Sequence, residues 1–240
     1  SGTVASRFLT ARAVRSLVSS SIRRPRSARA APPSRVPYLR PGSYPYPATR
    51  RSCSTMTTNS SINDQRLVWV DCEMTGLEVD SQTLVEIAVI VTEGDLTMVA
   101  EGPDIVIHQD EKVLDGMSEW CKKTFKKNGL TERIRSSTVT MEEAEQQVLD
   151  FLALHVVPKK APLAGNSVHM DRLFISKYMP RLADFLHYRI IDVSTVKELA
   201  RRWHPQEFLN APEKKMTHRA LDDIRESIDE LTFYRSHVFK

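Results

Sequence analysis

The sequence predicts an α/β domain in which helices flank a mixed β-sheet. Three observations lead to this class. Runs of β-branched and aromatic residues come first, short apolar runs then alternate with helical patterns, and no internal repeat is present. Strands followed by strand–helix alternation favour a layered domain whose helices cover a sheet.

Three strands are expected first, at residues 66–74, 83–93 and 98–107. The first reads Arg-Leu-Val-Trp-Val-Asp-Cys-Glu-Met, a run typical of a buried strand. Gly94 and Asp95 supply a turn signal between the second and the third. The simplest pairing of the three is an antiparallel meander.

The rest of the chain is expected to be mostly helical. Residues 110–127 and 140–157 have helical patterns, and Thr140 and Glu143 have capping-box spacing at the start of the second. The remaining expected elements are strands at 163–167 and 188–193 and helices at 168–178, 195–203 and 218–236.

Residues 1–63 differ in composition from the rest, because they contain 11 arginines, no lysine and no acidic residue. Arginines interleaved with apolar residues, without acids, are typical of a transit peptide for the mitochondrial matrix. A basic RNA-binding tail and simple disorder are the alternative interpretations. All three leave residues 64–240 as the folded domain. A start at Met56 would give a leaderless form in the cytoplasm or nucleus.

The charge of the domain is opposite in sign to that of the whole chain. The chain has a net charge of +4, whereas residues 64–240 carry 23 basic and 30 acidic side chains. The domain is therefore not a basic nucleic-acid binder. No apolar run approaches the ~18 residues of a membrane span. Cys53, Cys72 and Cys121 have no CxxC spacing, which argues against a disulfide scaffold and a zinc site.

Two acidic residues interrupt the first expected strand. Asp71 and Glu73 are two positions apart, so strand geometry places both carboxylates on one face, with Val70 and Cys72 on the other. Like charges beside a core repel each other and lose hydration. A divalent cation such as Mg²⁺ or Mn²⁺ would compensate them, since hard ions prefer carboxylate oxygens. Alternatively, the strand ends before Asp71 and both acids are solvated.

Another acid, Asp171, lies near the start of the helix expected at 168–178. A carboxylate in a first helical turn also suits the helix dipole, so a purely structural role is the alternative for this residue.

The last expected helix carries two neighbouring aspartates, and helix geometry distinguishes them. At 100° per residue, Asp222 points about 150° from the centre of the apolar stripe and Asp223 about 110°. Asp223 is therefore expected to flank the buried face, with Asp222 solvated. His218 lies at or before the helix start. The stripe consists of Ala220, Leu221, Ile224, Ile228 and Leu231.

These segments resemble, in order, the three motifs of the DEDDh exonuclease family, and more narrowly those of oligoribonucleases. They read Val-Asp-Cys-Glu-Met-Thr-Gly-Leu from Val70, Gly-Asn-Ser-Val-His-Met-Asp from Gly165 and His-Arg-Ala-Leu-Asp-Asp from His218. The likeness runs from about residue 66 to 236 and includes Tyr-Arg-Ile-Ile-Asp-Val-Ser-Thr from Tyr188. It implies an RNase H-like (DnaQ-like exonuclease) fold and removal of nucleotides from the 3′ end of short RNA.

The resemblance also implies roles for the acids and the histidine. Two divalent cations, Mg²⁺ or Mn²⁺ about 3.5–4 Å apart, would activate a water and stabilise the departing 3′ oxygen. Asp71 is expected to bridge both ions, with Glu73, Asp171 and Asp223 as further ligands. His218, with an ordinary pKa of ~6.5, is the expected general base.

The resemblance further implies how short single-stranded RNA is bound. Leu77 and Trp120 are expected to stack on bases, joined by Tyr188 from the second subunit of a homodimer. Stacking contributes ~1–3 kcal/mol per base without sequence readout. Core packing is the alternative for Trp120 and Tyr188, and a helix cap for Ser194. The residues expected to hold the 5′ phosphate are Ser167, Ser194 and Arg189, the last also from the second subunit.

Two other functions remain open at this point. One is a DEDDh exonuclease that acts on DNA or on longer RNA. The other is a non-catalytic RNA-binding relative that has kept the fold, although the complete set of acids and His218 argues against it.

Overall fold

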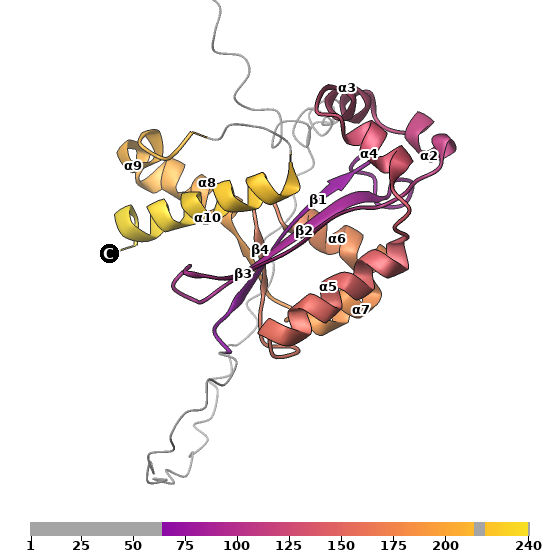
Figure 1. Ribbon diagram of the computed structural model, residues 1–240. Helices are drawn as coiled ribbons and strands as arrows, with labels where there is room; N and C mark the ends of the chain where they lie inside the picture. Colours follow the sequence, from indigo (N-terminus) through magenta and orange to yellow (C-terminus); the bar gives the residue numbers. More distant parts are fainter. Residues whose placement is uncertain (1–63, 214–218, 240) are drawn as a thin grey trace, which may run out of the picture. The chain divides into compact units, whose positions relative to one another are not determined.

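The computed structural model describes residues 64–213 and 219–239. These residues contain a five-stranded sheet in the order β3-β2-β1-β4-β5 (Figure 1). Antiparallel pairing joins β1 to β2 and β2 to β3, and parallel pairing joins β1 to β4 and β4 to β5. The predicted meander and mixed sheet are confirmed. The strands are β1 (Leu67–Met74), β2 (Leu84–Thr92), β3 (Met98–Val106), β4 (Leu163–Gly165) and β5 (Ile190–Asp192).

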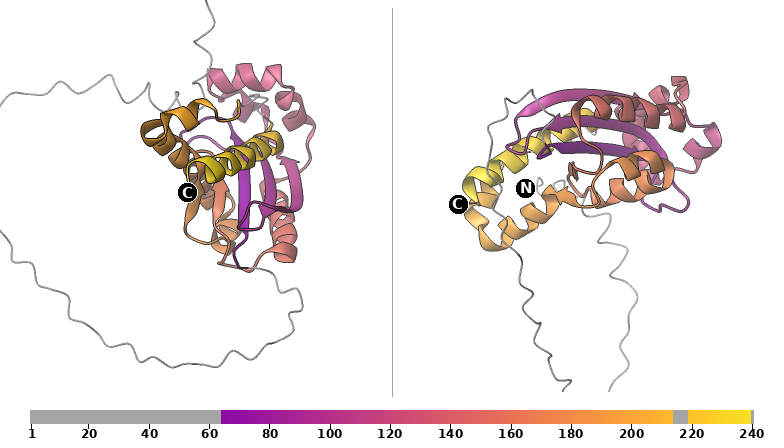
Figure 2. Two further views of the ribbon diagram at one scale, coloured as in Figure 1. Left: turned by 90° about the vertical axis from the view of Figure 1, so that its left-hand side faces the viewer. Right: turned by 90° about the horizontal axis from the view of Figure 1, so that it is seen from below.

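Helices cover both faces of the sheet (Figures 1 and 2). One core holds Val68, Val70 and Cys72 of β1 together with residues of three helices, and the other holds Leu67 and Trp69 with residues of two. The alternation of β1 side chains between the cores is the period-two pattern of a strand. The first face is covered by α5 (Met141–His155), α6 (His169–Tyr178) and α7 (Pro180–Phe185), and the second by α8 (Val193–Trp203) and α10 (Ala220–His237).

The single helix predicted over residues 110–127 is wrong, because the structure divides it into α2 (Glu111–Asp115) and α3 (Glu119–Lys127). Gly116 ends α2, and the Ser118 side chain begins α3 by accepting a hydrogen bond from the Cys121 backbone N–H at 3.2 Å. A capping serine allows a new helix to begin within a longer helical pattern, since its side chain accepts a hydrogen bond from a free N–H group of the new first turn.

Three short helices were not predicted. Gly129, with a φ of +79°, precedes α4 (Leu130–Ser136), and prolines begin α7 and α9 (Pro205–Leu209). Helices of five to seven residues have little periodicity to detect, and tertiary packing stabilises them. With α2 and α3, α4 builds a third core, which lies against Val85 of β2.

The capping box predicted for the helix at 140–157 is confirmed. Thr140 Oγ1 accepts from the Glu143 N–H at 3.2 Å, and Glu143 Oε2 accepts from the Thr140 N–H at 2.9 Å. The transit peptide predicted for residues 1–63 and the first residue of the helix predicted at 218–236 lie outside the described residues. Among the described helices, none combines the length and the apolar character that a membrane crossing requires.

Candidate active site

Asp71 and Glu73 both belong to β1, which continues to Met74, so the alternative that the strand ends before Asp71 is wrong. Both side chains are half-buried. Their alternation with Val70 and Cys72, which lie in the core under α5, α6 and α7, places them on the face that α10 covers. In the register with β2, Glu73 lies opposite Glu86.

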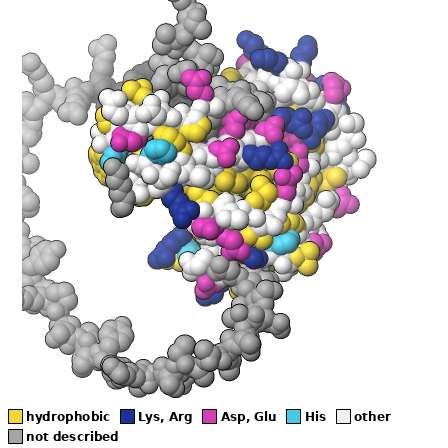
Figure 3. Space-filling model, turned by 60° about the vertical axis from the view of Figure 1, so that its left-hand side comes forward, with side chains coloured by type: hydrophobic (Ala, Val, Ile, Leu, Met, Phe, Trp, Pro, Cys, Tyr) yellow, Lys and Arg dark blue, Asp and Glu magenta, His cyan; other side chains and the backbone are white. Residues whose placement is uncertain are grey.

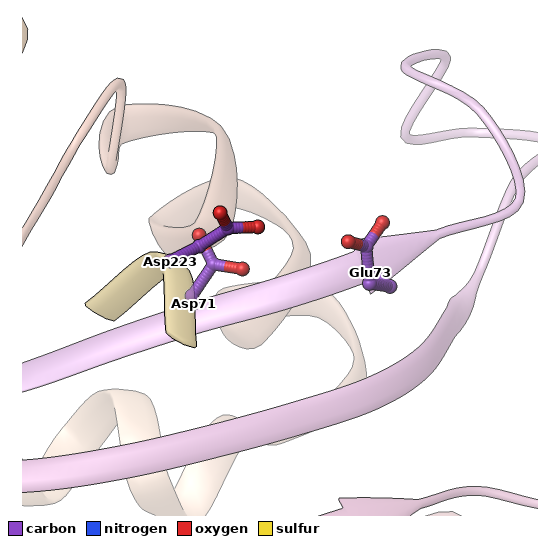
Figure 4. Close-up of side chains that lie close together, drawn as sticks. All are labelled: Asp71, Glu73 and Asp223. Atoms are coloured by element: carbon purple, nitrogen blue, oxygen red, sulfur yellow. The ribbon is translucent and has the colours of Figure 1, made fainter. Parts of the chain in front are cut away.

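The first turn of α10 adds a third carboxylate to this face. One carboxylate oxygen each from Asp71, Glu73 and Asp223 lies within 4.8 Å of the other two (Figure 4). Asp222 instead forms an ion pair with Arg225 at 3.1 Å, and its side chain is 50% exposed. The helical period of 100° per residue therefore predicted correctly that Asp223, and not Asp222, lies beside the buried face.

The electrostatics of the cluster favour a bound cation. Burial raises the pKa of the Glu73 carboxyl well above its usual range, and the charges of Asp223, Glu86 and Asp171 raise it further. These three described charges are all negative, and a divalent cation would relieve both the burial cost and the repulsion. Three carboxylates are the donor set that hard divalent cations prefer, so the residues fit such an ion.

Asp171 reaches the same strand from α6, but not as a member of the 4.8 Å group. Its Oδ1 accepts a hydrogen bond from the Cys72 backbone N–H at 2.9 Å. The Val68 N–H on the same edge pairs with Pro162, whereas β4 ends at Gly165 and leaves the Cys72 N–H without a strand partner. Asp171 supplies the missing acceptor, and burial raises its pKa to about 7.

The structure also identifies an acid that the sequence interpretation missed. Glu86 is fully buried on β2 and forms an ion pair with Arg133 of α4 at 2.8 Å. Burial raises the pKa of Glu86, and the charge of Arg133 opposes this effect. The signal for it was a lone acid in the otherwise apolar run from Leu84 to Val91.

Leu77 and Trp120 lie near the end of β1 and are 43% and 40% exposed. Two hydrogen bonds hold the start of α3 against this segment, from the Ser118 N–H to the Thr75 carbonyl at 3.0 Å and from Cys121 Sγ to the Met74 carbonyl at 3.3 Å. The exposure of the Trp120 side chain argues against the alternative that it packs in the core.

Ser167 and Ser194 lie side by side although 27 positions separate them in sequence. Their hydroxyl oxygens are 3.4 Å apart, and the Ser167 N–H donates to Asp192 Oδ1 at 2.9 Å. The structure places these serines at the C-terminal ends of β4 and β5. The cap of α8 is Asp192, so the alternative that Ser194 is the cap is wrong.

Tyr188 and Arg189 lie away from the group of three carboxylates in their own chain. Tyr188 is 73% exposed, and the Arg189 guanidinium lies 5.3 Å from the centre of its ring. Ile190 is level with Val68 across the sheet. Tyr188 therefore lies roughly 20 Å from Glu73 along the strand direction, at about 3.3 Å per residue. His218, the expected general base, lies outside the described residues.

Comparison with known proteins supports the same interpretation. The model of the family described as Exonuclease matches residues 68–231. The probable oligoribonuclease of Caenorhabditis elegans is 58% identical over 176 residues, which cover 73% of this chain and 90% of that protein. The mitochondrial oligoribonuclease of Homo sapiens is 53% identical over 176 residues, covering 73% of this chain and 74% of the human protein.

Among solved structures, the zinc-bound E. coli exonuclease I in complex with single-stranded DNA superposes with a TM-score of 0.54 at 14% identity. The match covers 72% of this chain, which spans 40% of the length of exonuclease I. At this identity the likeness concerns the fold, and it confirms the predicted RNase H-like exonuclease architecture. The family match and the identities above 50% show that this chain belongs to the oligoribonuclease family of exonucleases.

Proposed function

We propose that the protein is a 3′-to-5′ exoribonuclease that hydrolyses RNA of two to a few nucleotides to mononucleotides. The observation that carries the proposal is the group of three carboxylates, Asp71, Glu73 and Asp223, within 4.8 Å in a chain of this family. A water attacks the terminal phosphodiester, the bond from phosphorus to the 3′ oxygen breaks, and a nucleoside 5′-monophosphate leaves.

In this proposal Asp71, Glu73, Asp171 and Asp223 hold two divalent cations, Mg²⁺ or Mn²⁺. When bound, the cations would lower the pKa of the attacking water and stabilise negative charge on the departing 3′ oxygen. His218 accepts the proton of the water. A histidine suits this step because its ordinary pKa of ~6.5 lies near physiological pH.

We expect a preference for short substrates because this domain offers few contacts that could hold a long nucleic-acid strand. Extended nucleic acid is bound mainly by lysine and arginine along the phosphates. Residues 64–240 carry more acidic than basic side chains, and on the face in Figure 3 the basic ones are interspersed with acidic ones. Stacking on Leu77 and Trp120, both partly exposed, would instead grip individual bases.

The other end of the substrate is proposed to meet Ser167 and Ser194, which would donate hydrogen bonds to a terminal 5′ phosphate. From the second subunit of a homodimer, Arg189 would complete this contact and Tyr188 would stack on a base. Their position, roughly 20 Å along the strands from the acids of their own chain, supports a role across an interface rather than within one subunit. Tyr188 also lines a cavity of about 370 Å³ with Lys159, Arg172, Ala183, Asp184, Leu186 and His187.

For the place of action we propose mitochondria. Relatives that are 53% identical in Homo sapiens, Bos taurus and Mus musculus are named mitochondrial oligoribonucleases. The acid-free, arginine-rich composition of residues 1–63 fits a transit peptide. A form that starts at Met56 would remain in the cytoplasm or nucleus, and N-terminal sequencing of the protein from separated cell fractions tests this.

The test of the proposed activity compares three substrates: a 5′-phosphorylated diribonucleotide, a ten-nucleotide RNA and the corresponding deoxydinucleotide. Each is assayed with Mg²⁺, with Mn²⁺ and with chelator. We expect fast cleavage of the diribonucleotide only, and only with a cation. Equal rates on the ten-nucleotide RNA or on DNA would contradict the substrate class, and binding without cleavage would indicate a non-catalytic RNA-binding protein.

A further inference from the structure

One carboxylate outside the acid cluster organises the two serines. Asp192 ends β5 and caps α8, and its side chain is 11% exposed. Its Oδ1 accepts three hydrogen bonds, from the Ser167 N–H at 2.9 Å, the Ser194 N–H at 2.9 Å and the Ser194 hydroxyl at 2.5 Å. Its Oδ2 faces His169 Nδ1 at 3.3 Å.

Two of these hydrogen bonds exceed what a helix cap requires. A capping side chain accepts from the first turn of its own helix, which the bond from the Ser194 N–H already provides. The bond from the Ser167 N–H connects the loop after β4 to the end of β5, across 25 positions of sequence. The bond from the Ser194 hydroxyl fixes the rotamer of a side chain that the helix leaves free to turn.

Ser167 needs such support because its backbone is strained. Its φ of +55° lies in the left-handed region, which residues other than glycine, asparagine and aspartate rarely adopt. Strained residues of this kind persist where surrounding interactions hold them, and they concentrate at functional sites. The hydrogen bond from its own N–H to Asp192 holds Ser167 in this conformation.

Asp192 also lies beside the proposed reaction centre. Gly165 and Asp192 are paired at the C-terminal ends of the parallel strands β4 and β5. The backbone of β4 approaches β1 so closely there that a Cβ on Gly165 would come within 2.8 Å of the Val70 carbonyl oxygen. The negative charge of Asp192 contributes to the raised pKa of Asp171.

We propose that Asp192 is a positioning residue that sets Ser167 and Ser194 for the terminal 5′ phosphate of the substrate. The inference rests on the proposed function, since it presupposes that these serines meet a phosphate. A carboxylate next to a phosphate repels it. The contribution of Asp192 is therefore geometric, and it must outweigh an unfavourable charge.

Charge repulsion by Asp192 would weaken phosphate binding, whereas its positioning of the serines would strengthen it. The substitution Asp192→Asn therefore distinguishes the two effects. If charge dominates, removal of the carboxylate tightens binding of a 5′-phosphorylated diribonucleotide and lowers KM. If positioning dominates, neutral and weaker hydrogen bonds loosen both serines, and KM for this substrate rises about tenfold with kcat little changed. The same variant should change KM for the 5′-hydroxyl diribonucleotide less than about twofold, because that substrate has no phosphate to place.

A second variant separates positioning from folding. Asp192→Ser retains a good helix-capping residue, but its shorter side chain cannot reach the Ser167 N–H. We expect a Tm close to that of the unmodified protein together with the same selective rise in KM. Asp229→Asn, which removes an exposed carboxylate from α10, is the matched control and should leave both KM values unchanged.

Ser194→Ala distinguishes failure of this inference from failure of the proposed phosphate site. A selective loss on the 5′-phosphorylated substrate supports the site, and no selectivity in Ser194→Ala or in the unmodified protein overturns both proposals. If Ser194→Ala is selective while Asp192→Asn lowers KM, or raises it equally for both substrates, the phosphate site stands and the positioning role of Asp192 is wrong.

Discussion

Glu73 and Asp192 are both partly buried carboxylates near the C-terminal ends of their strands, and their surroundings are opposite. Around Glu73, the charges of Asp223, Glu86 and Asp171 all raise the pKa of its carboxyl group. Around Asp192, backbone N–H groups and a hydroxyl converge on one carboxylate oxygen.

The difference shows how to recognise a cation site without an ion. Hydrogen-bond donors compensate a buried carboxylate from within the protein, so Asp192 can organise its neighbours. At Glu73, by contrast, the neighbouring charges of Asp223, Glu86 and Asp171 disfavour the ionised carboxylate, and a divalent cation bound by the acid cluster of Asp71, Glu73 and Asp223 would relieve this repulsion.

The largest effect on activity is expected from a substitution of Asp223, which tests whether the acid cluster binds a cation. Asp223→Asn should lower kcat by about a thousandfold or more, because the proposed cation site loses a charged ligand. The same change should raise the Tm of the protein in chelator, since the charge of Asp223 no longer disfavours ionised Glu73. Steady-state kinetics and thermal unfolding measure the two effects.

Asp222→Asn is the matched control for this experiment, because its side chain is half exposed and pairs with Arg225. Its activity should stay within a few-fold of the unmodified protein. A severe loss in Asp222→Asn with a mild one in Asp223→Asn would overturn the helix-phase assignment.

The acid cluster is proposed to bind cations but not to accept the proton of the attacking water, and His218→Ala tests this division. We expect kcat to fall by about 10²–10⁴, the range for loss of a general base, while the dissociation constant of the diribonucleotide stays within about twofold. His108→Ala, at a partly exposed histidine outside the site, is the control. Equal losses in turnover and in binding would contradict the general-base role.

The stability of the cation-free protein should depend on pH through Asp171. Its folded pKa of about 7 exceeds its ordinary value of 3.8. Between these pH values the folded state keeps a proton that the unfolded state has released. The stabilisation is therefore complete below about pH 4, and it is lost as pH rises to about 7, by about 2–4 kcal/mol of unfolding free energy.

Denaturant unfolding in chelator from pH 4 to pH 8 checks this dependence. Asp171→Asn should flatten the curve, and added Mg²⁺ or Mn²⁺ should restore stability at pH 7 in the unmodified protein. Stability that rises over this interval in chelator would contradict the raised pKa of Asp171.

The smallest effect is expected at the proposed base-stacking surface, which carries no charge. Trp120→Ala should raise KM for the diribonucleotide about 5-fold to 100-fold, since loss of one stacked base costs ~1–3 kcal/mol. Trp203→Ala, at a tryptophan that is 68% exposed on α8, is the matched control. If both variants bind substrate equally well, the surface near the end of β1 is not where bases stack.

The sequence by itself determined the parts of this protein that depend on local periodicity. The period of two in β1 gave Asp71 and Glu73 a common face, and the helical period separated Asp223 from Asp222. The order of strands and helices gave the mixed sheet, and the spacing of Thr140 and Glu143 gave the capping box.

Tertiary structure alone decided the contacts between segments distant in sequence. Asp171 accepts a hydrogen bond from the Cys72 N–H because β4 ends where β1 continues. Glu86 forms its ion pair with Arg133, which lies on a helix too short to predict. The links from Asp192 to Ser167 and the separation of Tyr188 from the acids depend on strand register. Periodicity reports which side of its own element a residue occupies, whereas the partner it meets depends on where other elements begin and end.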